Sequence, residues 1–218
     1  MVDFDYIRPS TLDQAVELLA SQPDAKALSG GQTLIPTLKQ RLARPTLLVD
    51  LQGLTPLRGI EVSAEQVSVG AFTRHAETAS HVGIAQALPV LTHLASGIAH
   101  PQVRHMGTMG GSIANNDPAA DYPAALMGLA AQVQTSQRTL SSDDFFTGMF
   151  STALVPSELV VRIVFSRPQR AGYCKIPNPA SGYVTAGCFI SQWPDGRVRV
   201  AINGVGPCVF RARDLEEM

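Results

Sequence analysis

A pair of glycines sits where a predicted strand passes directly into a predicted helix. The strand covers residues 25–28, the segment Ser29-Gly30-Gly31-Gln32-Thr33 follows it, and the helix is predicted over 34–42. Paired glycines let the backbone approach a ligand closely and point successive N–H groups at one place. A helix that begins there adds the positive end of its dipole. The segment therefore has the features of a phosphate site, although a single glycine pair after a strand more often forms a tight turn.

A second glycine pair lies in residues 108–121, within a stretch predicted to be a loop over 103–116. Gly110 and Gly111 are flanked by the hydroxyls of Thr108 and Ser112 and followed by a polar run. Two such loops could hold the two phosphates of one dinucleotide, which would allow phosphate binding by a chain of net charge −1. Neither segment is a Walker loop or a GxGxxG fingerprint, and a pair of ordinary turns remains the alternative.

Hydrophobic spacing predicts several further elements around the two glycine segments. A helix after Ser10, which would cap it with Asp13 at the capping-box position, and a strand over 46–51 make the first 57 residues a small α/β unit. The remaining predictions are strands at 61–62, 66–69, 131–135, 159–165, 184–192 and 197–202, helices at 73–86, 89–98 and 122–129, turns at 141–144 and 194–196, and a linker at 166–171.

Composition excludes several classes of function. Seventeen Lys and Arg against 18 Asp and Glu argue against a general binder of nucleic acid or anionic membranes. The three cysteines form no CxxC pair, and the five histidines lack metal-ligand spacing, so no metal site is expected in this chain. An N-terminus without an apolar h-region and the lack of any apolar run near ~20 residues predict a cytoplasmic protein without a membrane span.

Ordered motifs along almost the whole chain resemble the FAD-binding (medium) subunit of the molybdenum hydroxylases, the family of carbon monoxide dehydrogenase and xanthine dehydrogenase. The segments that carry the resemblance are Phe4-Asp5-Tyr6-Ile7-Arg8-Pro9, Gly30-Gly31-Gln32-Thr33-Leu34-Ile35-Pro36, Arg41-Leu42-Ala43-Arg44-Pro45, Val69-Gly70-Ala71-Phe72-Thr73-Arg74-His75, Pro101-Gln102-Val103-Arg104, Gly107-Thr108-Met109-Gly110-Gly111-Ser112-Ile113-Ala114-Asn115, Asp117-Pro118-Ala119-Ala120-Asp121, Phe145-Phe146-Thr147-Gly148 and Gly204-Val205-Gly206-Pro207.

The resemblance implies an α+β fold. It predicts a two-subdomain FAD-binding fold of the vanillyl-alcohol-oxidase (PCMH) type, with subdomains at 1–57 and 58–167, and a shortened, truncated C-terminal α/β domain at 168–218. It also implies an FAD-dependent oxidoreductase subunit that works with a molybdopterin-binding large subunit and an iron–sulfur small subunit. Electrons would pass from the partner's 2Fe-2S clusters through FAD to an external acceptor: NAD, a quinone or oxygen.

The same resemblance assigns the cofactor site, with FAD bound noncovalently and no catalytic residue. Residues 29–33 and 108–112 would hold the pyrophosphate, Asp121 the ribityl or ribose part, and Lys175 would stabilise the anionic reduced flavin from beside N1 or C2=O. The predicted FAD-binding residues are Ser29, Gly30, Gly31, Gln32, Thr33, Leu34, Thr108, Met109, Gly110, Gly111, Ser112, Asp117, Asp121 and Lys175.

Other side chains leave alternatives open. His100 or His105 could attach a flavin covalently, and Tyr173, Tyr183 or Trp193 could stack on its ring, while Arg104 is predicted to be a structural or interface charge. A flavin-free scaffold protein of the same fold and a stand-alone FAD oxidoreductase are the competing functions. Bound FAD would exclude the flavin-free scaffold protein. Activity without partner subunits would favour the stand-alone FAD oxidoreductase.

Overall fold

The first sheet is small, parallel and close to the N-terminus. A computed structural model describes residues 3–218, and its first three strands are β1 (Asp5–Ile7), β2 (Lys26–Leu28) and β3 (Leu47–Asp50), in the order β1-β3-β2. Helix α1 (Leu12–Ser21) joins β1 to β2, and α2 (Leu34–Lys39) joins β2 to β3. Every residue of β3 is buried, as expected for the central strand of a covered parallel sheet.

The second sheet is antiparallel, five-stranded and assembled from distant segments in the order β4-β5-β10-β6-β7. Two short 3₁₀ turns, Leu51–Gly53 and Thr55–Leu57, connect the first sheet to it. Its strands are β4 (Ile60–Val62), β5 (Gln66–Gly70), β6 (Gln132–Thr135), β7 (Thr139–Ser141) and β10 (Val160–Ser166). The helices between β5 and β6 are α3 (His75–Ser80), α4 (Val82–Ala87), α5 (Pro89–Ser96), α6 (Pro101–Arg104), α7 (Met109–Asn115) and α8 (Tyr122–Gly128). Helix α9 (Ser142–Phe145) and the hairpin β8 (Phe146–Gly148) and β9 (Ser151–Thr152) follow β7.

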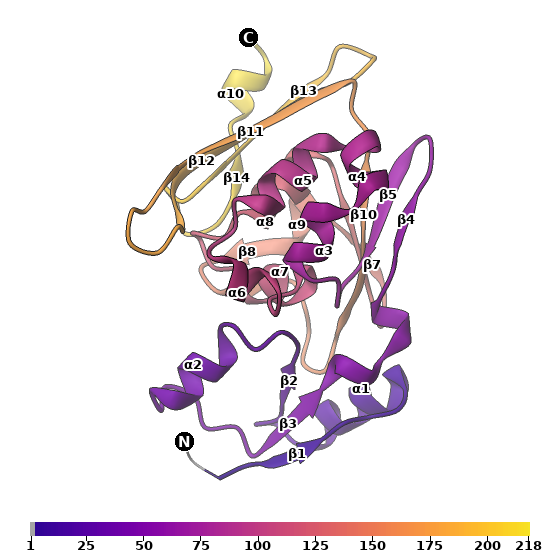
Figure 1. Cartoon of the computed structure of the whole chain (residues 1–218), viewed down its shortest axis with the longest axis vertical. Coiled ribbons are helices and arrows are strands. Elements are labelled where there is room, and N and C mark those ends of the chain that lie inside the picture. The colour runs from indigo at the N-terminus through magenta and orange to yellow at the C-terminus, as the bar shows by residue number, and fades with distance from the viewer. Residues whose placement is uncertain (1–2) are drawn as a thin grey trace.

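The third sheet lies at the opposite end of the molecule from the first, with the five-stranded sheet and its helices between them (Figure 1). It is antiparallel and consists of β11 (Arg170–Pro177), β12 (Val184–Gln192), β13 (Val198–Asn203) and β14 (Phe210–Arg211), followed by α10 (Arg213–Glu216). The predicted turn at 194–196 joins β12 to β13, and Gly196 supplies the positive φ of 87° that it needs.

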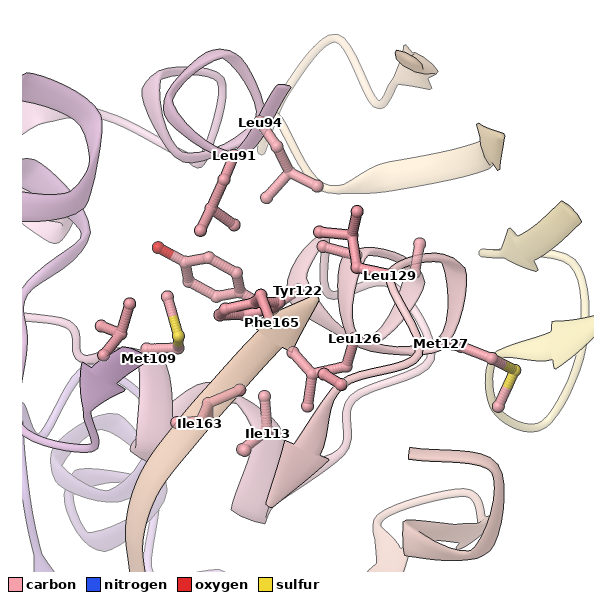
Figure 2. Close-up of a cluster of buried hydrophobic side chains, with 14 of the residues drawn as sticks. Leu91, Leu94, Met109, Ile113, Tyr122, Leu126, Met127, Leu129, Ile163 and Phe165 are labelled. Atoms are coloured by element: carbon pink, nitrogen blue, oxygen red, sulfur yellow. The ribbon is translucent and has the colours of Figure 1, made fainter. Parts of the chain in front are cut away.

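Two hydrophobic cores hold these layers together. The smaller one joins the first sheet to Phe72 and Leu159, and the larger one lies between the second sheet and its helices. Figure 2 shows part of the larger core, where Leu91, Met109, Tyr122 and Phe165 converge. The third sheet adds Phe189, Ala201 and Val209 to the same larger core. Residues 168–218 therefore do not form a separate core of their own in the described chain, and the three domain boundaries stay predictions.

Residues 103–116 depart most from the sequence prediction of a loop. They form the end of α6 and the whole of α7, with Thr108 as the N-cap whose side chain accepts the Gly111 N–H. Glycine and asparagine have low helix propensity, so the composition of residues 109–115 does not predict helix α7. Close packing explains the glycine: a methyl group on Gly110 would lie 2.6 Å from the Ala71 Cβ.

Several predicted boundaries also shift because side chains cap helix ends. The predicted helix 73–86 divides into α3 and α4, because the His81 imidazole accepts the Ile84 N–H and starts a new helix. Thr11 rather than Ser10 caps α1, and the expected turn at 141–144 is the capped start of α9. Across residues 3–218, no helix combines the length and apolar character needed to cross a bilayer.

Candidate functional site

A cavity of about 630 Å³ lies where the first sheet meets the second, within the range of about 300–1,000 Å³ common for small-molecule sites. Its walls include both glycine segments, which are almost eighty residues apart in the chain. Of the predicted FAD-binding residues, all except Met109 and Lys175 line it. The structure therefore brings most of the predicted site to one place.

The first glycine segment offers backbone donors to the cavity. It links the end of β2 to the start of α2, and within residues 3–218 the amides of residues 30–34 donate to no protein acceptor. The first N–H groups of a helix lack intrahelical acceptors, so they are available to an anion. Gly31 adopts a φ of 71°, a conformation that suits glycine and turns the chain into the helix.

Gly30 is required by close approach of the two segments. A methyl group there would lie 2.1 Å from the Met106 carbonyl oxygen and 2.8 Å from the Gly107 Cα, both backbone atoms. A hydrogen bond of 2.7 Å between Ser29 Oγ and Thr108 Oγ1 ties the segments together. The cavity wall is thus a seam between two backbones, which only a residue without Cβ permits at this position.

The second segment contributes differently from the prediction. Its amides are committed to the protein: Met109 N–H donates to Thr73 O, Gly110 N–H to Ala71 O, and Gly111 N–H to Thr108 Oγ1. The Ser112 N–H also bonds within the chain, to Thr108 O. The expected row of free N–H groups is therefore wrong here, and the segment offers hydroxyls and tight packing instead.

Met109 is the clearest correction to the predicted site. Its side chain is fully buried in the larger core, where Figure 2 shows it beside Tyr122 and Ile163, and it does not line the cavity. The position is apolar because it anchors α7 to the sheet. Its place between two cavity residues in the sequence explains why a motif-based assignment included it.

A buried ion pair closes another part of the wall. The Asp121 carboxylate, 5% exposed, lies 2.8 Å from Lys175 Nζ and accepts a hydrogen bond of 3.0 Å from the Tyr173 hydroxyl. Burial raises the pKa of the Asp121 carboxyl, and the Lys175 charge opposes that rise. The aspartate presents a fixed acceptor to the cavity, suited to ligand hydroxyls.

Lys175 lies behind Asp121 and not on the cavity wall. Its ammonium group also donates to Gly97 O at 2.8 Å and to Gly182 O at 3.1 Å, so three protein acceptors match its three N–H donors. Gly182 and Tyr183 do line the cavity. The lysine therefore positions Asp121 and the 181–183 loop, which differs from the predicted contact with a flavin ring.

His75 and Glu158 are polar cavity residues that lie outside the predicted FAD-binding set. His75 is 5% exposed, burial lowers its pKa to about 4, and its Nδ1 has no partner among the described residues. The Thr73-Arg74-His75 part of the family motifs was the sequence feature that could have identified His75 as a site residue. Glu158 accepts hydrogen bonds from Thr135 and Arg138; it precedes β10 in a segment without any motif, so no pattern marked it.

The remaining candidates divide according to their position. His100 and Tyr183 line the cavity, whereas His105, Tyr173 and Trp193 do not. Arg104 donates to the carbonyls of Ile98 and Ala99, which supports its predicted structural role. No group of three or more His, Cys, Asp or Glu residues suited to a metal ion occurs within 3–218.

The cavity has the chemistry that FAD requires. Free backbone amides at residues 30–34 suit the pyrophosphate, the Asp121 carboxylate suits ribityl or ribose hydroxyls, and apolar walls at Leu51, Leu57 and Phe72 suit a flat ring. Neutral amides supply the anion site, so no net positive charge is needed. The residues present therefore fit the cofactor.

Comparisons with known proteins point to one group of relatives. Residues 2–168 match the family described as the FAD binding domain in molybdopterin dehydrogenase. The chain is 32% identical to the nicotine 6-hydroxylase medium subunit of Paenarthrobacter nicotinovorans, over 98% of this chain and 78% of that one. It is 34% identical to the carbon monoxide dehydrogenase medium chain of Hydrogenophaga pseudoflava, over 95% of this chain and 77% of that one. A solved structure of the carbon monoxide dehydrogenase from that organism superposes with a TM-score of 0.93 at 35% identity, covering 100% of this chain and 80% of the other.

Proposed function

Because this chain belongs to the family of FAD-binding domains in molybdopterin dehydrogenases, we propose that it holds FAD noncovalently in the cavity between its first two sheets and transfers electrons for a molybdenum hydroxylase. It is an FAD-dependent oxidoreductase subunit of that family. The observation that carries the proposal is the seam at Gly30, where two distant glycine segments meet backbone to backbone beside a row of free amides.

Each part of the wall has a role in this proposal. The amides of residues 30–34 bind the pyrophosphate, and the Ser29 and Thr108 hydroxyls keep the two segments in register. Asp121 binds ribityl or ribose hydroxyls, and Lys175 opposes the rise of that carboxyl's pKa on burial and holds it in place. When bound, FAD supplies the capacity to accept and release electrons, while the protein sets its binding and orientation.

The partners follow from the names of the relatives, which are medium subunits or chains of hydroxylases and dehydrogenases. We propose that a molybdopterin-binding large subunit and an iron–sulfur small subunit assemble with this chain and deliver electrons to its FAD. The chain's cysteines lack cluster spacing, which is consistent with clusters in a partner. NAD, a quinone or oxygen would receive the electrons, and the cytoplasmic location stays a prediction.

Release of the bound nucleotide tests the proposal. The purified chain is precipitated with acid, and the supernatant is analysed for FAD; a chain isolated without nucleotide is first titrated with FAD. We expect one FAD per chain, and a weaker affinity for Asp121→Asn. Asp195→Asn is the matched control, because that carboxylate lies in the exposed turn between β12 and β13.

The competing functions give different results. A colourless chain that takes up no FAD would favour a flavin-free scaffold protein. Oxidation of a small substrate by the FAD-loaded chain alone would favour a stand-alone oxidoreductase. Equal FAD affinity in the wild type and in Asp121→Asn would contradict the assignment of Asp121, without affecting the rest of the site.

A further inference from the structure

Two of the three cysteines lie directly opposite each other on neighbouring strands of the third sheet. Cys174 of β11 and Cys188 of β12 are register partners in the antiparallel ladder, so their side chains lie on the same face. The next pair, Lys175 and Gly187, directs its side-chain positions toward the opposite face, because side chains alternate along a strand. Lys175 reaches Asp121 on that inner face, so the two thiols lie on the outer one.

The backbone hydrogen bonds fix which kind of pair this is. The Trp193 N–H of the hairpin donates to Arg197 O, toward β13. Backbone groups alternate between the two neighbours of a central strand, so Cys188 directs its N–H and C=O toward β11. Cys174 and Cys188 are therefore a hydrogen-bonded pair, for which the expected Cα separation of about 5.5 Å falls in the range found for disulfides.

The two thiols are accessible to reagents. Cys174 is exposed and Cys188 is partly exposed, and both are free thiols in this structure. Cys208 is also free, but it lies in the segment before β14 and outside the named strands. Burial, with the neighbouring Cys174 thiol, raises the pKa of Cys188, so the exposed Cys174 is the better placed thiol for a first attack.

We propose that Cys174 and Cys188 form a reversible thiol–disulfide site that exchanges with small disulfides of the glutathione type. The Cys174 thiolate attacks one sulfur of the reagent, forms a mixed disulfide and releases one thiolate. The Cys188 thiolate then attacks the Cys174 sulfur, closes the intrachain bond and releases the second thiolate. Two protein thiols are oxidised, one reagent disulfide is reduced to two thiols, and the two protons go to the released thiolates.

The position in the ladder makes this disulfide easy to reduce. Opposed Cβ atoms lie about 4.5–5.5 Å apart, with the larger values in hydrogen-bonded pairs, whereas a disulfide prefers about 3.8 Å. The strands must therefore shift to close the bond, and strain of this kind favours reduction. A labile bond is suited to exchange with the thiol pool and not to permanent bracing of the sheet.

Thiol counting with peptide mapping tests the site on the full 218-residue chain. The chain is incubated with glutathione disulfide, remaining thiols are alkylated, and tryptic peptides are identified by mass. Cleavage after Arg170, Lys175 and Arg197 places Cys174 and Cys188 on separate peptides, and Cys208 falls on a third after Arg199. We expect the peptides 171–175 and 176–197 to become linked, Cys208 to stay alkylatable, and excess reduced glutathione to restore all three thiols.

Single serine variants separate pairing from simple exposure. Cys174→Ser and Cys188→Ser should stop at a mixed disulfide on the remaining thiol, whereas Cys208→Ser should still form the intrachain link. Adducts on Cys174 and Cys188 that never resolve in the wild type, a link that includes Cys208, or a link between two chains would each overturn the proposal. Circular dichroism of each variant confirms that the fold is retained.

Discussion

Replacing Gly30 with alanine tests the backbone seam at its tightest point. The added methyl group would lie 2.1 Å from the Met106 carbonyl oxygen, a distance that real Cβ contacts essentially never show, since they stay beyond 3.0 Å. The two segments must therefore separate by about 1 Å, and overpacking of this kind costs about 1–3 kcal/mol. The three nearest obstructing atoms all belong to the backbone, so no side-chain rotation can relieve the contact.

The same displacement should weaken FAD binding, because the donors of residues 30–34 would move away from the opposite wall. A loss of about 1.4 kcal/mol corresponds to a tenfold weaker affinity, so we expect at least that change for Gly30→Ala. Fluorescence titration with FAD gives the affinity, and urea unfolding of the FAD-free chain gives the stability.

Two other alanine substitutions calibrate this result. Gly111→Ala places its methyl group 2.9 Å from the Thr108 hydroxyl oxygen, a smaller overlap than the 2.1 Å approach at Gly30, so its effect should be smaller. Gly172→Ala meets nothing within 4 Å and should leave stability and affinity unchanged or slightly improved. Wild-type affinity and stability in Gly30→Ala would refute the reasoning, because the seam would then be dispensable.

Three further predictions concern buried groups. His75 has its pKa lowered from 6.5 to about 4 by burial, so its stabilising contribution is complete above about pH 6.5 and lost as the pH falls toward 4. That contribution is up to about 3 kcal/mol, and urea unfolding from pH 7 to 4.5 should show a smaller pH dependence in His75→Gln than in the wild type. Lys175→Met leaves the Asp121 carboxylate buried without its counter-ion, which should cost about 3–5 kcal/mol at pH 7, and the double variant with Asp121→Asn should recover much of it; an additive loss would contradict the pairing. Gly128→Ala would place a methyl group 2.3 Å from the Phe189 ring and should lower the free energy of unfolding by about 1–3 kcal/mol, with partial rescue by Phe189→Leu, whereas a lack of rescue would argue against this contact as the cause.

The elements that sequence predicted well are those with strong local signals. The buried strand β3, the half-buried strand β12 and the apolar helix α8 lie within a residue or two of their predicted bounds. Their hydrophobic spacing reports burial directly. The link to a family came from ordered motifs, and the comparisons agree with it.

The elements that sequence missed depend on contacts between distant segments. Helix α7 is rich in small and polar residues, and its Gly110 is explained by close packing on Ala71 and not by a turn. Glu158 reaches the cavity only because β10 pairs with β5 and β6. Met109 and Lys175 show the converse: each lies inside a motif or near the site, but its side chain is committed to the core or to Asp121.

The two hydrophobic cores have a consequence for how the chain matures. The smaller core joins the first sheet to Phe72 and Leu159, and the cavity walls combine residues of that sheet with residues packed on the larger core. A ligand bound in this cavity would contact residues packed on both cores, so its binding free energy would add to the free energy that holds these two parts of the chain together. The chain without ligand should therefore be cleaved by protease near residues 54–60 more readily than the loaded chain.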